Sequence, residues 1–179
     1  GQYRFDFDTG AGEDSADDAS VSLRPATPPT GLPDAPPPGP EELRDLAGRL
    51  EDEGDLESAA QMYRAALAAG GPNAEVCFLL AELLYRLVDL TAARERYYMA
   101  IELDEDYVEA RANLGCILAE LGQHELAAAA FEGALAFHHD YPDAHYHLAR
   151  SLDELGRGDE AQPHWQAFRE LAGDSPWAL

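Results

Sequence analysis

Beyond residue 39, hydrophobic residues recur at intervals of three and four positions, with polar residues between them. This period is typical of amphipathic α-helices, in which side chains three and four apart lie on one face. The same stretch contains no alternating strand pattern and no Asn-Gly hairpin turn. The pattern therefore predicts an all-α segment from residue 40 onward.

The helical pattern repeats itself every 34 residues. Leucine, leucine, alanine and an aromatic residue each return at this interval. The four sets are Leu46, Leu80, Leu114 and Leu148; Leu50, Leu84, Leu118 and Leu152; Ala59, Ala93, Ala127 and Ala161; and Tyr63, Tyr97, Phe131 and Trp165. Because the interval is constant, four units follow one another without insertion or deletion. They span residues 40–73, 74–107, 108–141 and 142–175.

This skeleton resembles the tetratricopeptide repeat, a helix–turn–helix unit of the same period. The resemblance implies eight helices stacked into a right-handed α-solenoid, with a concave face lined by the first helix of each unit. It also implies a non-catalytic scaffold that binds proteins. Gly54, Gly122 and Gly156 stand at the turn between paired helices, where a left-handed backbone is needed. Val88 replaces this glycine in the second unit, so we expect a less regular turn there.

The segment before the repeats has a different composition. Seven of the twelve prolines lie between Pro25 and Pro38, and residues 1–39 carry seven acids against two arginines. Such a segment cannot bury enough apolar surface to offset the entropy of ordering it. We therefore expect an acidic, flexible stretch in which the prolines favour an extended spacer.

The start of this stretch is an exception, because residues 3–8 hold three aromatic side chains. Tyr3, Phe5 and Phe7 are costly to leave in water, so we expect this docking segment to bind to something. One candidate is the groove of the repeats, in the same chain or in a neighbouring one. The other is a preceding domain.

The opposite end of the repeats raises a question of capping. Ser175 and Pro176 resemble the start of a helix, so residues 176–179 would begin a capping helix that is truncated or absent. Repeat arrays normally end on a polar cap. Either the cap is missing, or another chain covers the apolar end and makes a homo-oligomer.

The net charge of −23, from 12 basic residues against 35 acidic ones, argues against direct nucleic acid binding by this chain. No apolar run is long enough to span a bilayer, and no signal segment opens the chain, so we expect no membrane contact. Two cysteines do not make a disulfide framework. The expected compartment is the reduced cytoplasm.

Motifs that could carry catalysis are weak. Asp8-Thr9-Gly10 matches the active-site triplet of aspartic proteases, but that chemistry needs two carboxylates held together on a β-framework. Cys77 takes a core-packing position. Cys116 should face the concave side, where no neighbour obviously lowers the pKa of its thiol. We therefore predict that the chain is not an enzyme.

One group of residues has metal-ligand types. It comprises the histidines His138, His139, His145 and His147, with Asp140 and Asp143. No pair of these histidines has the i, i+4 spacing that would hold zinc on one helix. We interpret the group as a polar loop between repeats, with His145 in the packing seam, and predict no metal and no cofactor.

Counting along each first helix identifies the side chains that should line the concave groove. Phe78, Tyr85 and Tyr146 are large rings that the repeat does not need for packing, whereas Ala112 and Cys116 are small and would leave a hollow between them. The full set is Arg44, Phe78, Glu82, Tyr85, Ala112, Asn113, Cys116, Tyr146, His147, Arg150 and Asp153. This combination suits a peptide that carries aromatic anchors beside acids.

The leading function is therefore a protein-protein interaction scaffold that binds a peptide or protein segment in this groove. Residues 2–8 and 175–177 resemble flanking segments in bacterial regulators of the mercury-resistance (MerR) type that carry tetratricopeptide tails. That resemblance implies the partner-binding part of a transcriptional regulator whose DNA-binding domain lies outside this chain. A third alternative is a chaperone like those of type III secretion, which would hold an extended substrate.

Overall fold

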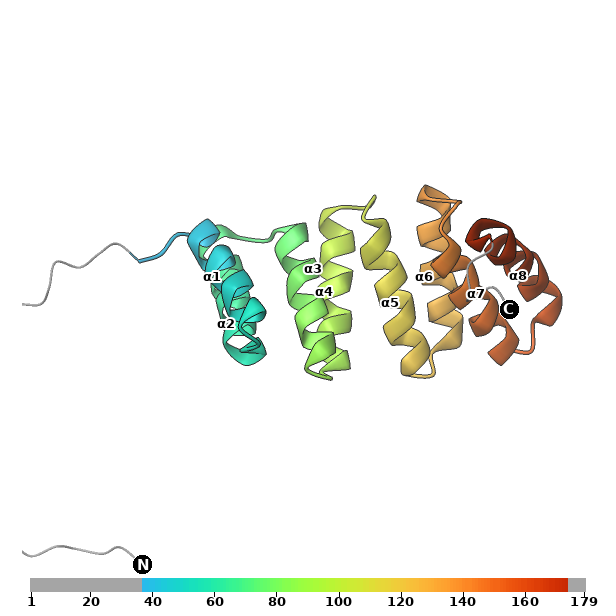
Figure 1. Cartoon of the computed structure of the whole chain (residues 1–179), viewed down its shortest axis with the longest axis horizontal. Coiled ribbons are helices and arrows are strands. Elements are labelled where there is room, and N and C mark those ends of the chain that lie inside the picture. Colours follow the sequence, from blue (N-terminus) through green and yellow to red (C-terminus); the bar gives the residue numbers. More distant parts are fainter. Residues whose placement is uncertain (1–36, 174–179) are drawn as a thin grey trace, which may run out of the picture. The chain divides into compact units, whose positions relative to one another are not determined.

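The computed structural model describes residues 37–173, and these residues form eight helices joined by short turns (Figure 1). The first helices of the four units are α1 (Pro40–Asp52), α3 (Ala74–Arg86), α5 (Val108–Glu120) and α7 (Pro142–Glu154). The second helices are α2 (Leu56–Gly70), α4 (Leu90–Leu103), α6 (His124–Phe137) and α8 (Gly158–Ala172). No strand occurs among the described residues, so the predicted all-α solenoid is confirmed.

The repeat period is visible in the helix bounds. The first helices begin 34 residues apart, and so do the second helices. Each helix packs mainly against its neighbours in the chain, and α5 also contacts α7. The docking segment with Tyr3, Phe5 and Phe7 and the expected cap start at 176–179 lie outside the described residues, so both remain predictions.

Side-chain caps begin several of the helices. Asp55 and Asp89 each accept a hydrogen bond at 3.1 Å from the backbone N–H three residues later, at the start of α2 and α4. Such caps satisfy amide groups that have no partner within the helix. At the same repeat position, Gln123 before α6 makes no side-chain cap. None of the helices in residues 37–173 combines the length and the apolar character that crossing a membrane requires.

The core lies within each helix pair and between neighbouring pairs. The aromatic residues of the second helices fill it, because Tyr97 and Phe131 are buried. Trp165, at the same repeat position in the last unit, is only partly buried. Small residues on the first helices let the rings approach. At Gly115 an added Cβ would lie 2.6 Å from the Phe131 ring, so only glycine fits there.

The turn at Val88 is regular, although Val88 stands where the other units have glycine. Val88 has a φ of 63°, close to the 72° of Gly122 and the 73° of Gly156. Its N–H donates to the Tyr85 carbonyl at 2.9 Å, and the next N–H donates to the Leu84 carbonyl at 2.9 Å. The turns at the two glycines carry the same pair of bonds. The prediction of a less regular turn was therefore wrong, because these bonds impose the left-handed conformation on valine.

Candidate functional site

The candidate site is a pair of adjoining hollows on the first helices. The first, the α3–α5 hollow, has a volume of about 180 Å³. Its lining residues are Glu82, Tyr85, Tyr97, Asn113, Cys116 and Ile117. The second, the α5–α7 hollow, has a volume of about 210 Å³. It is lined by Cys116, Ala119, Glu120, His124, His147, Arg150, Ser151 and Glu154. Cys116 belongs to both hollows, so the two are neighbours along the array.

Hydrogen bonds hold the walls of the α3–α5 hollow. Oε1 of Glu82 accepts a hydrogen bond from Nδ2 of Asn113 at 2.7 Å and another from the Tyr97 hydroxyl. The Tyr85 hydroxyl donates to Oε1 of Glu120 at 2.6 Å. These bonds link α3 to α4 and α5, so a ligand would meet side chains that are already oriented.

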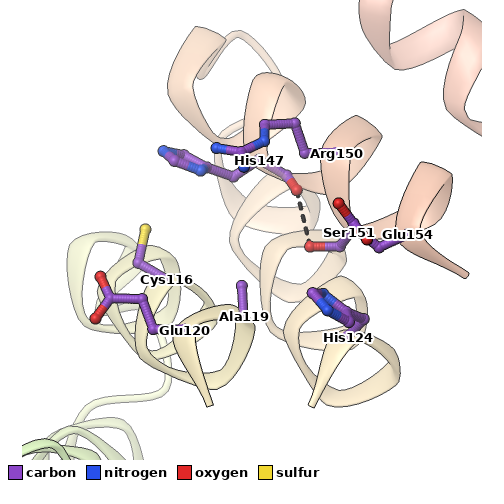
Figure 2. A pocket seen from close by; sticks show the side chains of 8 residues that line it. All are labelled: Cys116, Ala119, Glu120, His124, His147, Arg150, Ser151 and Glu154. Carbon is purple, nitrogen blue, oxygen red and sulfur yellow. Dashed lines mark hydrogen bonds between the residues drawn. The ribbon is translucent and has the colours of Figure 1, made fainter. Parts of the chain in front are cut away.

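The α5–α7 hollow lies between residues of three helices. Figure 2 shows Cys116 and Glu120 of α5 on one side, with His147 and Arg150 of α7 across from them. The ring of His147 stacks on Phe131, with centroids 5.6 Å apart and an angle of 13° between the planes. This stacking fixes the position of the imidazole at the edge of the hollow.

The surroundings of Cys116 and Tyr85 favour the protonated form of each group. Burial raises the pKa of the Cys116 thiol to about 11, with smaller contributions from Glu120, Asp143 and Glu82. The hydrogen bond to Glu120 raises the pKa of Tyr85 to about 12. The thiol is therefore a poor nucleophile at neutral pH. The two groups are suited to hydrogen bonding and packing rather than to covalent chemistry.

The pKa of His147 is lowered, first by burial and then by Arg150. A neutral imidazole at neutral pH offers one donor and one acceptor. The arrangement as a whole can bind polar and aromatic groups of a ligand.

Two sequence models of the tetratricopeptide repeat family match this chain, one over residues 44–108 and the other over residues 118–167. Together they span the array that the helix bounds define. The chain is a tetratricopeptide repeat protein. Such repeat arrays are a family of non-catalytic scaffolds for protein-protein interaction.

Solved structures of MamA share the fold of this tetratricopeptide repeat protein. A crystal structure of MamA has a TM-score of 0.70 at 22% identity and covers 74% of this chain and 77% of that one. The structure of MamA AMB-1 has a TM-score of 0.71 at 23% identity, covering 77% and 76% of the two chains. The MamA RS-1 ArsTM double mutant has a TM-score of 0.71 at 19% identity and covers 74% of each chain.

At these identities the likeness shows the fold alone. No curated protein matches the chain significantly. Neither the family matches nor these MamA structures support the resemblance to MerR-type regulators.

The hollows of this tetratricopeptide repeat protein contain many but not all of the residues that counting along the helices proposed. Glu82, Tyr85, Asn113, Cys116, His147 and Arg150 line one hollow or both. Ala112 is only 5% exposed and lines neither hollow. The depression forms at Cys116, one turn further along α5.

The three remaining proposed aromatic and basic residues lie outside the two hollows. Phe78 is partly buried and stacks on Tyr107 of the loop before α5, with centroids 4.8 Å apart. This contact packs the loop before α5 against α3 and leaves Phe78 less available as an anchor. Arg44 of α1 forms an ion pair at 3.6 Å with Glu75 of α3.

Tyr146 belongs to an aromatic cluster between α7 and α8. Its ring meets Trp165 edge to face at 5.4 Å and lies 5.2 Å from the ring of Phe168. The Arg150 guanidinium lies 5.8 Å from the Tyr146 centroid. Nearby, Asp153 accepts a hydrogen bond from Nε1 of Trp165 at 2.9 Å. Both proposed groove residues therefore hold α8 against α7.

Several residues that line the hollows were not among those predicted by counting along the first helices. They are Tyr97, Ile117, Ala119, Glu120, His124, Ser151 and Glu154. Glu120 and Glu154 occupy one repeat position, so extending the count by one residue would have found both. Tyr97 and His124 come from second helices, and no count along first helices could have included them.

The histidine group does not assemble into a metal site. No group of three or more metal-ligand side chains comes together among residues 37–173. His145 instead lies between α7 and α8, where its Nδ1 is 2.9 Å from Nδ1 of His164. Its Nε2 is 2.9 Å from the carbonyl oxygen of His139. The interpretation of His145 as a seam residue agrees with these contacts.

Proposed function

We propose that this protein is a scaffold that binds a segment of another protein chain along α3, α5 and α7. The observation that carries the proposal is the pair of adjoining hollows, which follow one another on first helices of consecutive repeats. The binding residues that we propose are Glu82, Tyr85, Asn113, Cys116, His147 and Arg150, together with Glu120 and Glu154.

Two properties of these hollows support a peptide as the ligand. An extended segment advances by about 3.3–3.6 Å per residue, so side chains a few residues apart can enter successive hollows of a repeat array. The walls are already held by the hydrogen bonds from Tyr85 to Glu120 and from Asn113 to Glu82. Such preorganisation lowers the entropy that binding would otherwise cost.

The partner in this proposal is a separate protein. The docking segment at 3–8, acting in cis or in trans, and a second copy of the chain at the C-terminal end stay as further candidates for occupants. Deletion of residues 1–8 tests the first of these. If the docking segment occupies the groove, the deletion lowers the melting temperature and raises the affinity for added peptides.

The groove assignment is tested with the full chain as bait in an affinity purification. Tyr85→Ala is compared with Tyr98→Ala, a matched control on α4. Tyr98 is 41% exposed and Tyr85 is 40% exposed, but Tyr98 lines neither hollow. We expect Tyr85→Ala to lose partners that the wild type and Tyr98→Ala both retain. Equal retention by all variants would show that the partner binds elsewhere.

A further inference from the structure

We propose that the segment bound in the groove is basic and places an arginine side chain in the α3–α5 hollow. This inference rests on the proposed function and names the chemistry of its ligand. It differs from the expectation drawn from the sequence, which favoured acids beside aromatic anchors.

The arginines of the first helices that lie near the groove are already engaged. Arg44 is paired with Glu75, and Arg86 forms an ion pair with Glu51. Arg150 lies over the ring of Tyr146. A ligand carboxylate would therefore have to compete with existing contacts.

The carboxylates of the hollows, in contrast to these arginines, are not paired with a group of opposite charge in the part of the chain that the structure describes. Within residues 37–173, Glu82, Glu120 and Glu154 make no ion pair. The hydrogen bonds that Glu82 and Glu120 accept there all reach Oε1, so Oε2 of each carboxylate receives none. These free oxygens are acceptors for the parallel N–H groups of a guanidinium.

The walls of the α3–α5 hollow also favour a cation. Tyr85, which is 40% exposed, contributes an aromatic ring to the lining, and no basic residue lines this hollow. A guanidinium stacks on aromatic faces and is less strongly hydrated than an ammonium, so arginine fits such a wall better than lysine. Burial is the main cause of the raised pKa of Cys116, and the smaller contributions of Glu120, Asp143 and Glu82 agree with a negative potential at this point.

The neighbouring α5–α7 hollow has a buried polar atom at its edge. Nδ1 of His124 is buried and has no hydrogen-bond partner among the described residues. His124 lines the α5–α7 hollow, and Figure 2 shows its ring at the lower edge of that space. A buried polar atom without a partner is costly, and a polar group of a bound peptide would remove the cost.

The net charge of the whole chain also favours a basic ligand. The net charge of −23 attracts basic segments and repels acidic ones during encounter. The docking segment at 3–8 carries Asp6 and Asp8 against Arg4 alone, so it is a poorer match than a basic partner.

The test is selection of a random peptide library, displayed on phage, against the full chain. Recovered peptides are synthesised, and their affinities for the wild type and its variants are measured by fluorescence anisotropy. We expect arginine to be enriched over its frequency in the library. Glu82→Gln and Glu120→Gln should each weaken binding about tenfold, because each removes a charged acceptor while keeping the shape of the side chain. Glu102→Gln, which changes an exposed carboxylate of α4, is the matched control and should leave affinity unchanged.

The other outcomes are distinguishable. Recovered peptides that are acidic or uncharged, and that lose binding to Tyr85→Ala, would overturn the basic ligand but keep the proposed groove. Arginine-rich peptides that bind Glu82→Gln and Glu120→Gln as well as wild type would also overturn it, because the attraction would then be nonspecific. Peptides that bind all variants equally, Tyr85→Ala included, would overturn both proposals. Circular dichroism melting of each variant checks that the fold is retained.

Discussion

Val88 has a backbone conformation that a β-branched side chain adopts only at a cost. Its φ of 63° lies in the left-handed region, and its side chain is 77% exposed. The side chain therefore gains little from burial that could offset the strain. The hydrogen bonds of the turn hold the residue in place, so the cost falls on the stability of the folded chain.

We predict that Val88→Gly raises the free energy of unfolding by about 1 kcal/mol. Glycine adopts this conformation without strain, although it loses more backbone entropy on folding. Urea denaturation followed by circular dichroism measures the change. The reverse substitution, Gly122→Val, introduces the same strain into the third unit and should lower stability. A less stable Val88→Gly would mean that the valine side chain makes a stabilising contribution that its exposure hides.

At the scale of the helix, repeat positions allow a cap to be moved from one unit to another. Asp55 and Asp89 cap α2 and α4, whereas Gln123, at the same position before α6, has a similar backbone but no cap bond. The carboxylate of an N-cap aspartate accepts a hydrogen bond from a backbone N–H that has no partner within the helix. Its negative charge also interacts favourably with the positive end of the helix dipole. The third unit thus lacks an interaction that the first two units have.

We predict that Gln123→Asp stabilises the protein by about 1 kcal/mol, the usual value of a side-chain cap. Thermal melting and urea denaturation measure the effect. Asp89→Gln is the reciprocal variant, which should destabilise by a similar amount. If Gln123→Asp had no effect while Asp89→Gln destabilised, the start of α6 would have to be held by something other than its cap.

At the scale of the whole array, stability is a sum of contacts within units and between neighbouring units. The seam of the final described pair includes a contact between two histidines. Nε2 of His145 faces a carbonyl oxygen, so this nitrogen is the donor and Nδ1 of a neutral His145 accepts from Nδ1 of His164. This arrangement does not survive when both rings are protonated.

Stability should consequently depend on pH. Burial, followed by His145, lowers the pKa of His164, and burial followed by Arg150 lowers the pKa of His147. Each folded-state pKa lies below the unfolded value, so the unfolded chain binds protons first as pH falls. The contribution of these two histidines to the free energy of unfolding is fully present above the unfolded pKa of about 6.5. It is lost as the pH falls below that value.

We predict that the melting temperature of the wild type decreases as the pH is lowered from about 7.5 to about 5.5. The melting temperature of His164→Asn should decrease less over the same range. Asparagine keeps a polar group near the position of Nδ1 but does not titrate. His139→Asn replaces an exposed imidazole and serves as the control. This substitution keeps the backbone carbonyl of residue 139, which accepts the hydrogen bond from Nε2 of His145. Equal pH dependence in wild type and His164→Asn would assign the loss to other groups.

The repeat itself could be predicted from the sequence because its causes are local and periodic. Leucines, alanines and aromatic residues at a constant interval require the same helix pair to form four times, and the helix bounds follow that interval. About half of the groove could be predicted by the same count. Ala112 could not, since its burial depends on how closely neighbouring pairs approach.

What the sequence determined by itself was therefore the helix pair, its period and the positions that a first helix can present. Only the tertiary structure decided which of these positions meet, because that depends on the offset between one pair and the next. Nδ2 of Asn113 reaches Glu82 in the preceding unit, and the hydroxyl of Tyr85 reaches Glu120 in the next unit. These contacts between units, rather than the repeat pattern, orient the walls of the two hollows.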